Sequence, residues 1–284
     1  MTKRIRFHPE EDKLDEFYKK FESNYDTAIT ELLVLTNQRV GGGYKEHGMI
    51  VPSLRFVASV NLETGELSQE RGLLQWIIPD DTREGWGFDF EQFQIYRIRV
   101  RKHKKLKEYY LLLDILEENV SDPQLNPIKE HVSTPVTIED GTLGTFLLER
   151  EYSWFVGAAD WRGTKCNVYL MTDEEDGETA EKAYAHFQTL YQDREVWDDK
   201  FRQFSADELL ELANDWYEYS DDDFDVEIPI QRDEFLRRLS IASIEIDDEG
   251  SMTVYYDADE MFTDHAIVIY AKIDGTISSA SIIG

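Results

Sequence analysis

The sequence predicts an α+β protein of two domains. An N-terminal, mainly antiparallel β domain with a leading helix precedes a C-terminal antiparallel sheet with two or three helices packed on one face. Three observations predict this class. The 284 residues suffice for two domains of ordinary size. With 41% hydrophobic residues, including 15 Phe, 15 Tyr and 6 Trp, the chain can fill sizeable cores. In the second half, strand-like segments come first, helical segments follow and strand-like segments return, which is typical of α+β folds.

The N-terminal half is predicted to begin with an amphipathic helix over residues 10–22. Leu14, Phe17, Tyr18 and Phe21 recur at the spacing that lines one face of a helix. Alternation and short apolar runs then predict strands at residues 32–35, 56–62, 73–78, 93–101 and 109–116. Together these strands are expected to form a small sheet or barrel.

The break between the domains is predicted within residues 119–142. Pro123, Pro127 and Pro135 punctuate this stretch, and proline interrupts regular structure. The charge balance of the chain also changes there. We therefore expect an N-terminal domain over residues 1–122, a linker over 123–142 and an acidic α+β domain over 143–284.

Helices are predicted to interrupt the strands of the C-terminal half. Helical spacing runs through residues 180–201, and the pattern Ser-Ala-Asp-Glu at 205–208 is that of a capping box, which predicts a new helix over 206–217. A short helix is expected over 233–239. Strands are expected at residues 144–149, 154–159, 164–171, 241–246, 252–256, 266–273 and 277–283.

Charge is the most uneven property of the sequence. The net charge is −29, and residues 141–284 hold 34 Asp and Glu against 11 Lys and Arg. Such a field repels nucleic acid and anionic lipid surfaces, and it speeds encounters with basic proteins. We therefore expect a basic protein as partner, and neither nucleic acid nor a membrane. The alternative is that the charge only keeps the protein soluble, and no prediction of oligomeric state follows from it.

The compartment is predicted from three features. No segment reaches about 18 consecutive apolar residues, the length that a membrane-spanning helix needs. The basic residues 1–9 are followed by acidic residues rather than by an apolar stretch, so a secretory signal peptide is not expected. Cys166 is the single cysteine, which excludes an intrachain disulfide and fits a reducing compartment. The sequence thus predicts a cytoplasmic protein.

The residues around His265 form the first candidate catalytic site. Asp257, Asp259 and Glu260 precede it, and Asp264 is its neighbour. A carboxylate beside an imidazole can orient a general base, which suits an acid–base or metal-assisted hydrolase. Adjacent residues of a strand point to opposite faces, however, so a structural histidine is the competing interpretation. No H-x-E or H-E-x-x-H pattern accompanies His265, and we expect neither a bound metal nor a cofactor.

A basic segment over residues 97–107 is the second candidate site. Eight of its eleven residues are Arg, Lys or His. With aromatic neighbours, it is typical of a sheet surface that binds a ligand or nucleic acid. The charge of the whole molecule argues against nucleic acid, and the alternative is a hairpin whose cations are matched by acidic neighbours. The candidate ligand-binding residues are Arg97, Arg99, Arg101, Lys104 and Lys105.

Four other kinds of feature in the sequence favour a structural role over a catalytic or ligand-binding role. The acidic residues 173–176 and 220–227 lack the ligand order of an EF-hand and are expected to be solvated loops. The run Gly41–Gly43 lacks the ending of a phosphate-binding loop, and Cys166 is expected to be a small buried side chain. Large aromatic residues of the second half are expected in its core, with a peptide or small-molecule groove as the alternative. They are Trp154, Phe155, Trp161, Trp197 and Trp216.

Several motifs of the second half resemble a bacterial family catalogued as domain of unknown function 2262. They are residues 143–146 (Leu-Gly-Thr-Phe), 160–163 (Asp-Trp-Arg-Gly), 209–214 (Leu-Leu-Glu-Leu-Ala-Asn) and 261–267 (Met-Phe-Thr-Asp-His-Ala-Ile), with Asp274, Gly275 and Gly284. The resemblance covers residues 141–284, and the first half is similar to the region that accompanies this domain. The sequence departs from the family at Asp264, where a small residue or glycine is usual, and a role of the histidine would change with it. The family has no established activity, so the resemblance implies a fold and no reaction.

The sequence therefore predicts a non-enzymatic, acidic protein-binding module. No coherent set of catalytic residues emerges, whereas the acidic charge is concentrated in one half. One form of this function is immunity-type protection, in which an acidic protein blocks a basic toxin by charge-steered association and a few aromatic anchors. The alternative is a hydrolase centred on His265, and a third option is ligand binding by the basic segment.

Overall fold

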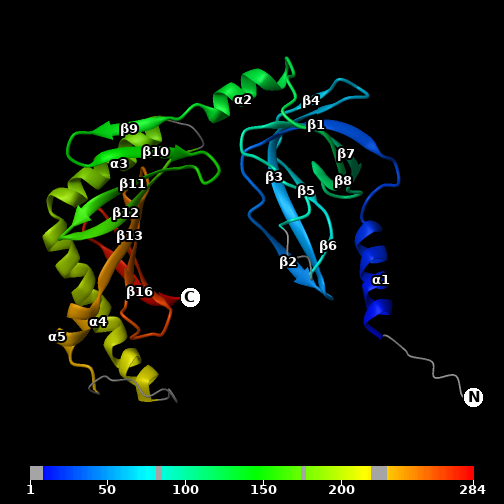
Figure 1. Cartoon of the computed structure of the whole chain (residues 1–284). Coiled ribbons are helices and arrows are strands. Elements are labelled where there is room, and N and C mark those ends of the chain that lie inside the picture. Colours follow the sequence, from blue (N-terminus) through cyan, green and yellow to red (C-terminus); the bar gives the residue numbers. More distant parts are fainter. Residues whose placement is uncertain (1–8, 81–84, 174–176, 219–228) are drawn as a thin grey trace, which may run out of the picture. The chain divides into compact units, whose positions relative to one another are not determined.

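The chain divides into two compact units, Met1–Thr134 and Pro135–Gly284, each with its own sheet (Figure 1). A computed structural model describes the backbone of residues 9–80, 85–173, 177–218 and 229–284. These residues form five helices and sixteen strands, and the predicted α+β class is confirmed. Every helix among them is too short or too polar to cross a membrane. The acidic segment 220–227 and residues 174–176 of the other acidic run lie outside the described residues.

The N-terminal unit is built on a closed five-stranded barrel. Its elements are α1 Pro9–Glu22, β1 Thr30–Thr36, β2 Gly42–Glu46, β3 Met49–Asn61, β4 Leu67–Ser68, β5 Gly72–Gln75, β6 Ile78–Pro79, β7 Ile95–Lys102, β8 Tyr109–Glu117 and α2 Leu125–Ser133. The pairing runs β1-β3-β5-β8-β7 and back to β1, antiparallel except between β5 and β8. Such a five-stranded Greek-key barrel has the architecture of the OB-fold. The strands β2, β4 and β6 extend it by pairing with β3.

Apolar side chains explain how this unit packs. One buried cluster, which includes Phe56 and Trp76, draws side chains from all five barrel strands. The indole Nε1 of Trp76 donates a hydrogen bond to the carbonyl oxygen of Trp86 at 2.6 Å. On the outside, α1 turns Phe17 and Phe21 toward the barrel, which confirms the predicted helix and its apolar face.

The segment that the sequence predicts as a linker, residues 123–142, contains ordered elements. The helix α2 lies within it and buries Leu125 in a cluster with Leu33 of β1. The boundary between the two units follows Thr134, and the strand β9 (Thr137–Asp140) belongs to the second unit.

The C-terminal unit is an eight-stranded sheet with helices on one face. Its elements are β9, β10 Gly144–Glu149, β11 Trp154–Trp161, β12 Thr164–Met171, α3 Gly177–Gln192, α4 Arg194–Glu218, α5 Arg232–Arg238, β13 Ser240–Ile246, β14 Ser251–Asp257, β15 Ala266–Lys272 and β16 Ile277–Ile283. The strands lie in the order β16-β15-β14-β13-β12-β11-β10-β9. The expected antiparallel pairing is wrong at one place, since β12 and β13 run parallel. Three helices lie between these two strands in the sequence, and a crossover of this kind returns the chain in the same direction.

The prediction of a new helix at the capping box is wrong, because α4 is continuous through that point. Ser205 does not cap a helix but is fully buried in the middle of α4. Phe201 and Leu209, one turn before and after it, are buried in the same core. The helical spacing of buried side chains therefore continues through Ser205, and burial outweighs the local capping preference.

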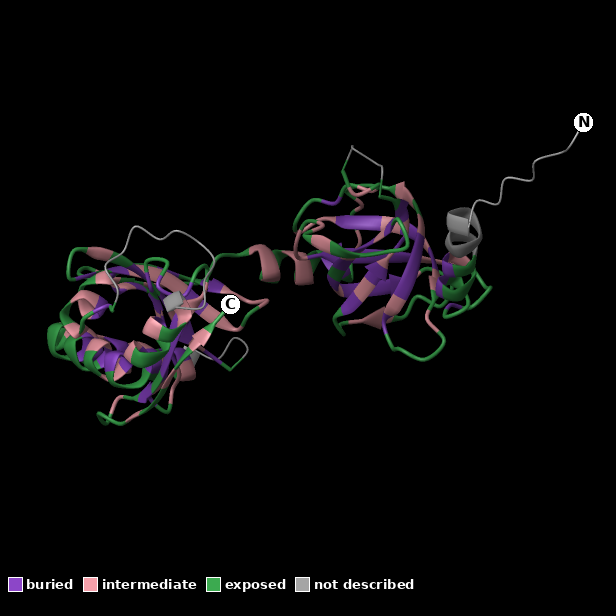
Figure 2. Ribbon diagram, turned by 90° about the horizontal axis from the view of Figure 1, so that it is seen from below, coloured by how far each residue is buried: buried purple, intermediate pink, exposed green. Residues whose placement is uncertain are grey.

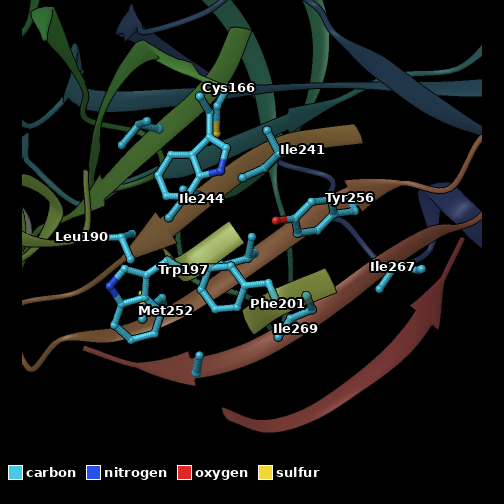
Figure 3. Close-up of a cluster of buried hydrophobic side chains, with 14 of the residues drawn as sticks. Cys166, Leu190, Trp197, Phe201, Ile241, Ile244, Met252, Tyr256, Ile267 and Ile269 are labelled. Atoms are coloured by element: carbon cyan, nitrogen blue, oxygen red, sulfur yellow. The ribbon is translucent and has the colours of Figure 1, made fainter. Parts of the chain in front are cut away.

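The helices cover only one face of this sheet. α3, α4 and α5 lie on the same side of it in Figure 1. On that side the central strands bury Ile244, Val254 and Ile269. Buried residues alternate along these strands with partly exposed ones, whose side chains belong to the opposite face, and the colours of Figure 2 show both classes in this sheet. Figure 3 shows the covered side, where Phe201 of α4 lies among strand residues such as Met252. Within the described parts of this unit, the other broad face of the sheet carries no helix, and we call it the helix-free face.

A buried carboxylate joins the longest helix to the sheet. Asp198 of α4 is fully buried. Its Oδ1 accepts hydrogen bonds from Nε1 of Trp161 at 3.1 Å and from the hydroxyl of Tyr256 at 2.6 Å. Its Oδ2 accepts hydrogen bonds from Nε of Arg202 at 2.6 Å and from Nη1 of Arg162 at 2.8 Å. Four donors from the helix and the sheet thus converge on one carboxylate, which we call the Asp198 cluster.

The Asp198 cluster also reaches α5. Nη1 of Arg202 donates to the carbonyl oxygens of Leu236 at 2.8 Å and Leu239 at 2.6 Å. Burial alone raises the pKa of Asp198, but hydrogen bonds from Arg202 and Tyr256 outweigh burial and leave that pKa lowered. The pKa of Tyr256 is raised well above its usual value because the phenol is buried beside Asp198. Near pH 7 the carboxylate is therefore ionised and the phenol is a neutral donor.

Replacing Asp198 with asparagine should lower the free energy of unfolding by about 3 kcal/mol, because the variant leaves Arg202 and Arg162 without their shared carboxylate. Asp199→Asn is the matched control. Asp199 is the next residue of α4, its side chain is 69% exposed and it pairs with Arg162. Its replacement should cost less than about 1 kcal/mol. Urea unfolding followed by tryptophan fluorescence measures both variants, and equal losses would contradict the role of the cluster.

Candidate functional site

The five residues predicted as a catalytic group lie around one hollow. Asp257, Asp259, Glu260, Asp264 and His265 all line an open hollow of about 800 Å³. It lies at the end of β14 and in the loop that leads to β15. The structure therefore places these five candidate side chains close together on the C-terminal unit.

The loop between β14 and β15 directs carboxylates outward because its apolar residues point inward. Met261 and Phe262 are fully buried. Asp259, Glu260 and Thr263 have φ angles of 46°, 60° and 59°, which are uncommon for residues other than glycine. Such a backbone persists only where the surrounding packing maintains it. The two buried side chains thus fix the shape of the acidic rim.

The ring of His265 is oriented by its neighbours. Its Nδ1 lies 3.1 Å from the carbonyl oxygen of Phe262, to which it donates, and 3.3 Å from Oδ1 of Asp264. The ring meets Trp216 edge to face, with centroids 5.6 Å apart. Gly284 approaches so closely that a Cβ there would lie 2.4 Å from the imidazole. Backbone and aromatic contacts therefore hold the ring, and Asp264, which is 95% exposed, is a carboxylate within its reach.

Protein groups engage the other carboxylates of the hollow. Nε of Arg238 lies 3.0 Å from Oδ2 of Asp259, and Oδ1 of Asp257 accepts a hydrogen bond from the amide of Asp259 at 2.8 Å. Over the described parts of the chain, no group of three His, Cys, Asp or Glu side chains is placed to hold a metal ion. The arrangement offers acid–base groups on a hollow surface rather than a set of metal ligands.

Acidic neighbours match the basic segment of the N-terminal unit. Arg97 of β7 donates to Oε2 of Glu31 from Nε at 3.0 Å and from Nη2 at 2.6 Å, and Arg99 lies 3.6 Å from the same carboxylate. These contacts lower the pKa of Glu31, with the hydrogen bond from Arg97 as the largest cause. Nη1 of Arg101 lies 3.2 Å from Oε2 of Glu22. The three arginines are thus already paired within the unit.

The two candidate lysines lie in the turn after β7. Nζ of Lys104 donates to the carbonyl oxygen of Ser23 at 2.8 Å. Lys105 is exposed, and its backbone amide donates to Nδ1 of His103 at 3.1 Å. This geometry fits the matched hairpin that the sequence analysis raised as the alternative to a ligand-binding surface. Within the glycine run, Gly42 and Gly43 begin the strand β2.

The helix-free face of the C-terminal sheet carries large aromatic side chains. Tyr152 stacks on Trp154 with ring centroids 4.8 Å apart, and Trp154 contacts Tyr169 at 4.7 Å. Tyr255 of β14 and Tyr270 of β15 lie on the same face. Tyr152 is 58% exposed and Tyr270 is 45% exposed. We call these five residues the aromatic stripe.

Trp154 is predicted in the core from the sequence, and the structure corrects this prediction. Phe155 and Trp161 share one phase of β11 and are buried, whereas Trp154 has the opposite phase. Its indole Nε1 donates to Oε2 of Glu149 at 2.7 Å. Strict alternation counted from a buried Phe155 would have placed Trp154 on the other face. Of the remaining aromatic residues predicted in the core, Trp197 is buried, and Trp216 is partly buried against the core cluster of this unit.

A groove of about 370 Å³ lies at one edge of the same face, where β13 ends and β14 begins, and Tyr270 of the aromatic stripe lines it. Glu245 of β13 lines it, in register with Tyr169 on one neighbouring strand and Thr253 on the other. Thr253 in turn lies opposite Tyr270. Burial raises the pKa of Glu245, and a hydrogen bond with Tyr255 only partly offsets this. A half-buried carboxylate thus lies among the residues of the aromatic stripe, and no sequence motif pointed to it.

Each half of the chain matches a known protein family. Residues 140–282 match a family described as an uncharacterized protein conserved in bacteria (DUF2262). This chain belongs to the DUF2262 family. Residues 18–132 match a second family, a domain of unknown function (DUF7021). The predicted resemblance is therefore confirmed, and the search of curated proteins gave no match.

Two motifs that carry the DUF2262 resemblance support the fold. Trp161 and Arg162, from residues 160–163, are donors of the Asp198 cluster. Arg162 and Gly163 have positive φ angles of 55° and 85°, which suits the tight turn between β11 and β12. In residues 209–214, Oδ1 of Asn214 accepts the amide of Ile230 at 2.7 Å, close to the start of α5. Both motifs therefore serve packing, whereas the motif that contains His265 forms the rim of the hollow.

Cys166 should not react with thiol reagents in the folded protein. The side chain is fully buried, and burial followed by the nearby charge of Asp198 raises its pKa to about 12. The thiolate is the reactive form, so almost none is available at pH 8. With Ellman's reagent we expect no released colour from the native protein and one equivalent per chain in denaturing urea. Stoichiometric reaction of the native protein would show that this strand opens to solvent.

Proposed function

We propose that this protein is a non-enzymatic, acidic protein-binding module that engages its partner through the helix-free face of the C-terminal sheet. The aromatic stripe on that face is the observation that carries the proposal. Tyrosine and tryptophan are the residue types enriched at binding hot spots, because each offers a large apolar surface with a polar end. A sheet normally turns such side chains toward its covered side, yet Tyr152, Trp154 and Tyr270 lie on the uncovered one.

Charge supports a basic partner. Residues 141–284 carry 34 acidic against 11 basic side chains, a field that attracts basic proteins over several ångströms to tens of ångströms in dilute salt. Charge of this kind raises the association rate, while aromatic anchors slow dissociation. One form of this function is immunity-type protection against a basic toxin in the cytoplasm, and the single buried Cys166 suits a reducing compartment.

Capture of a partner on the immobilised protein tests the proposal. We expect a basic protein to be retained, with retention falling as salt rises from about 50 mM to about 500 mM because the charges become screened. The double variant Tyr152→Ala/Trp154→Ala should bind that protein at least about tenfold more weakly, as loss of a hot spot does. Val196→Ala is the matched control, since Val196 is 56% exposed but belongs to α4.

Two outcomes would overturn the proposal. If retention of the partner did not change with salt concentration, association driven by the acidic charge would be contradicted. Equal losses in the double variant and in Val196→Ala would show that the aromatic stripe is not the contact surface. Far-ultraviolet circular dichroism of all variants controls for folding.

A second candidate function, acid–base hydrolysis, is supported by the meeting of His265 and four carboxylates at one hollow. Assays of hydrolysis with p-nitrophenyl acetate and bis-p-nitrophenyl phosphate distinguish the two candidate functions. The binding module should give no hydrolysis above the buffer rate. A hydrolase would instead lose its rate in His265→Asn by at least about a hundredfold, the usual contribution of a general base. His186→Asn, on α3, is the control histidine and should not change the rate.

A further inference from the structure

We propose that the groove around Glu245 binds an arginine side chain of the basic partner protein. This inference rests on the proposed function, and it names the group that the helix-free face would recognise. Glu245, Thr253 and Tyr270 line the groove together on three adjacent strands. The groove measures about 370 Å³, which is room for a side chain rather than for a folded element.

Of the side chains that the structure describes, none forms an ion pair with Glu245. Lys272 lines the same groove but is exposed and is not bonded to Glu245, and Asp247 adds a second carboxylate there. Asp247 is already satisfied, since its Oδ1 accepts the amide of Ser251 at 2.8 Å. A half-buried carboxylate without a cation is costly, and burial accordingly raises the pKa of Glu245. A positive group from a partner would offset this cost.

The aromatic neighbours favour arginine over lysine. Tyr169 is in register with Glu245 on β12, and Tyr255 is hydrogen-bonded to Glu245 from β14. Tyr270 lies one strand further along the same row. A guanidinium group can donate two parallel hydrogen bonds to a carboxylate while its plane stacks on a phenol ring. The ammonium group of lysine is a strongly hydrated point charge, which cannot form the paired hydrogen bonds to the carboxylate and stack on a phenol ring in the same way.

The acidic charge of the unit argues for a basic protein rather than a second copy of this chain. Residues 141–284 carry three times as many acidic as basic side chains, 34 against 11. Two copies that met through this face would bring like charges together, which opposes association. A basic partner gains from the same field and supplies the arginine.

Titration with N-acetyl-arginine amide, followed by nuclear magnetic resonance of the tyrosine rings, tests the site in the full chain. We expect saturable shifts of the Tyr169, Tyr255 and Tyr270 signals, assigned through Tyr→Phe variants. The affinity should fall at least about tenfold in Glu245→Gln and with N-acetyl-citrulline amide, which has the same shape without the charge. Glu249→Gln is the matched control, since Glu249 is exposed in the turn of the same hairpin.

The outcomes separate this inference from the proposed function. Equal binding by Glu245→Gln and Glu249→Gln, or by arginine and citrulline amides, would overturn the arginine site. So would N-acetyl-lysine amide binding as tightly as the arginine compound, or a concentration-dependent dimer that Trp154→Ala dissociates. If a partner is captured through the aromatic stripe but binds Glu245→Gln as tightly as it binds the unchanged protein, the binding function holds and the arginine site fails. Binding of arginine amide that depends on Glu245, with no partner captured, would support the site and oppose the protein-binding function.

Discussion

The C-terminal unit depends on one buried carboxylate. Asp198 receives hydrogen bonds from β11, from the turn after it, from β14 and from its own helix, while Arg202 extends the same network to α5. Desolvation of an isolated carboxylate would cost several kcal/mol, so it is the number and direction of the donors that make its burial tolerable. These directions are satisfied only when α4 lies across the sheet in one position. The Asp198 cluster therefore helps to hold α4 in place on the face of the sheet that carries the apolar core.

The uncovered face follows from that choice. With α3 and α4 on one side, the alternation of every strand sends its second set of side chains to the other side, including Trp154, Tyr255 and Glu245. These side chains are only partly buried there, so each contributes less to the stability of the fold than a fully buried side chain does. The partner contact that we propose would bury the surface that these side chains leave accessible. The candidate binding surface is thus a consequence of the same interaction that organises the core.

Periodicity predicted most elements correctly, since it reports which side chains are buried. The helix with Phe17 and Phe21 and the strands before and after the central helices are present. The errors arise where a local signal met a long-range one. The pattern that starts at Ser205 is a good helix-capping signal, but α4 is continuous because the helical spacing of its buried side chains is not interrupted there. The Asp198 cluster could not be foreseen, because residues 36 to 58 positions apart meet there and no spacing rule joins them.

The number of acidic residues is a poor guide to where a partner is bound, and burial is a better one. In the hollow around His265, Asp264 is 95% exposed and Asp259 is paired with Arg238. Water screens exposed charges so well that a contact there contributes about 1 kcal/mol or less. Glu245 is a single charge, yet it is half-buried beside tyrosines, and no cation among the described side chains pairs with it. A carboxylate in that position has already lost part of its hydration, so it loses less further hydration when a cation binds. The attraction between the two charges is also stronger there, because water screens it less. The diffuse field of the unit can bring a basic protein near, but a half-buried charge of this kind can select the side chain that binds.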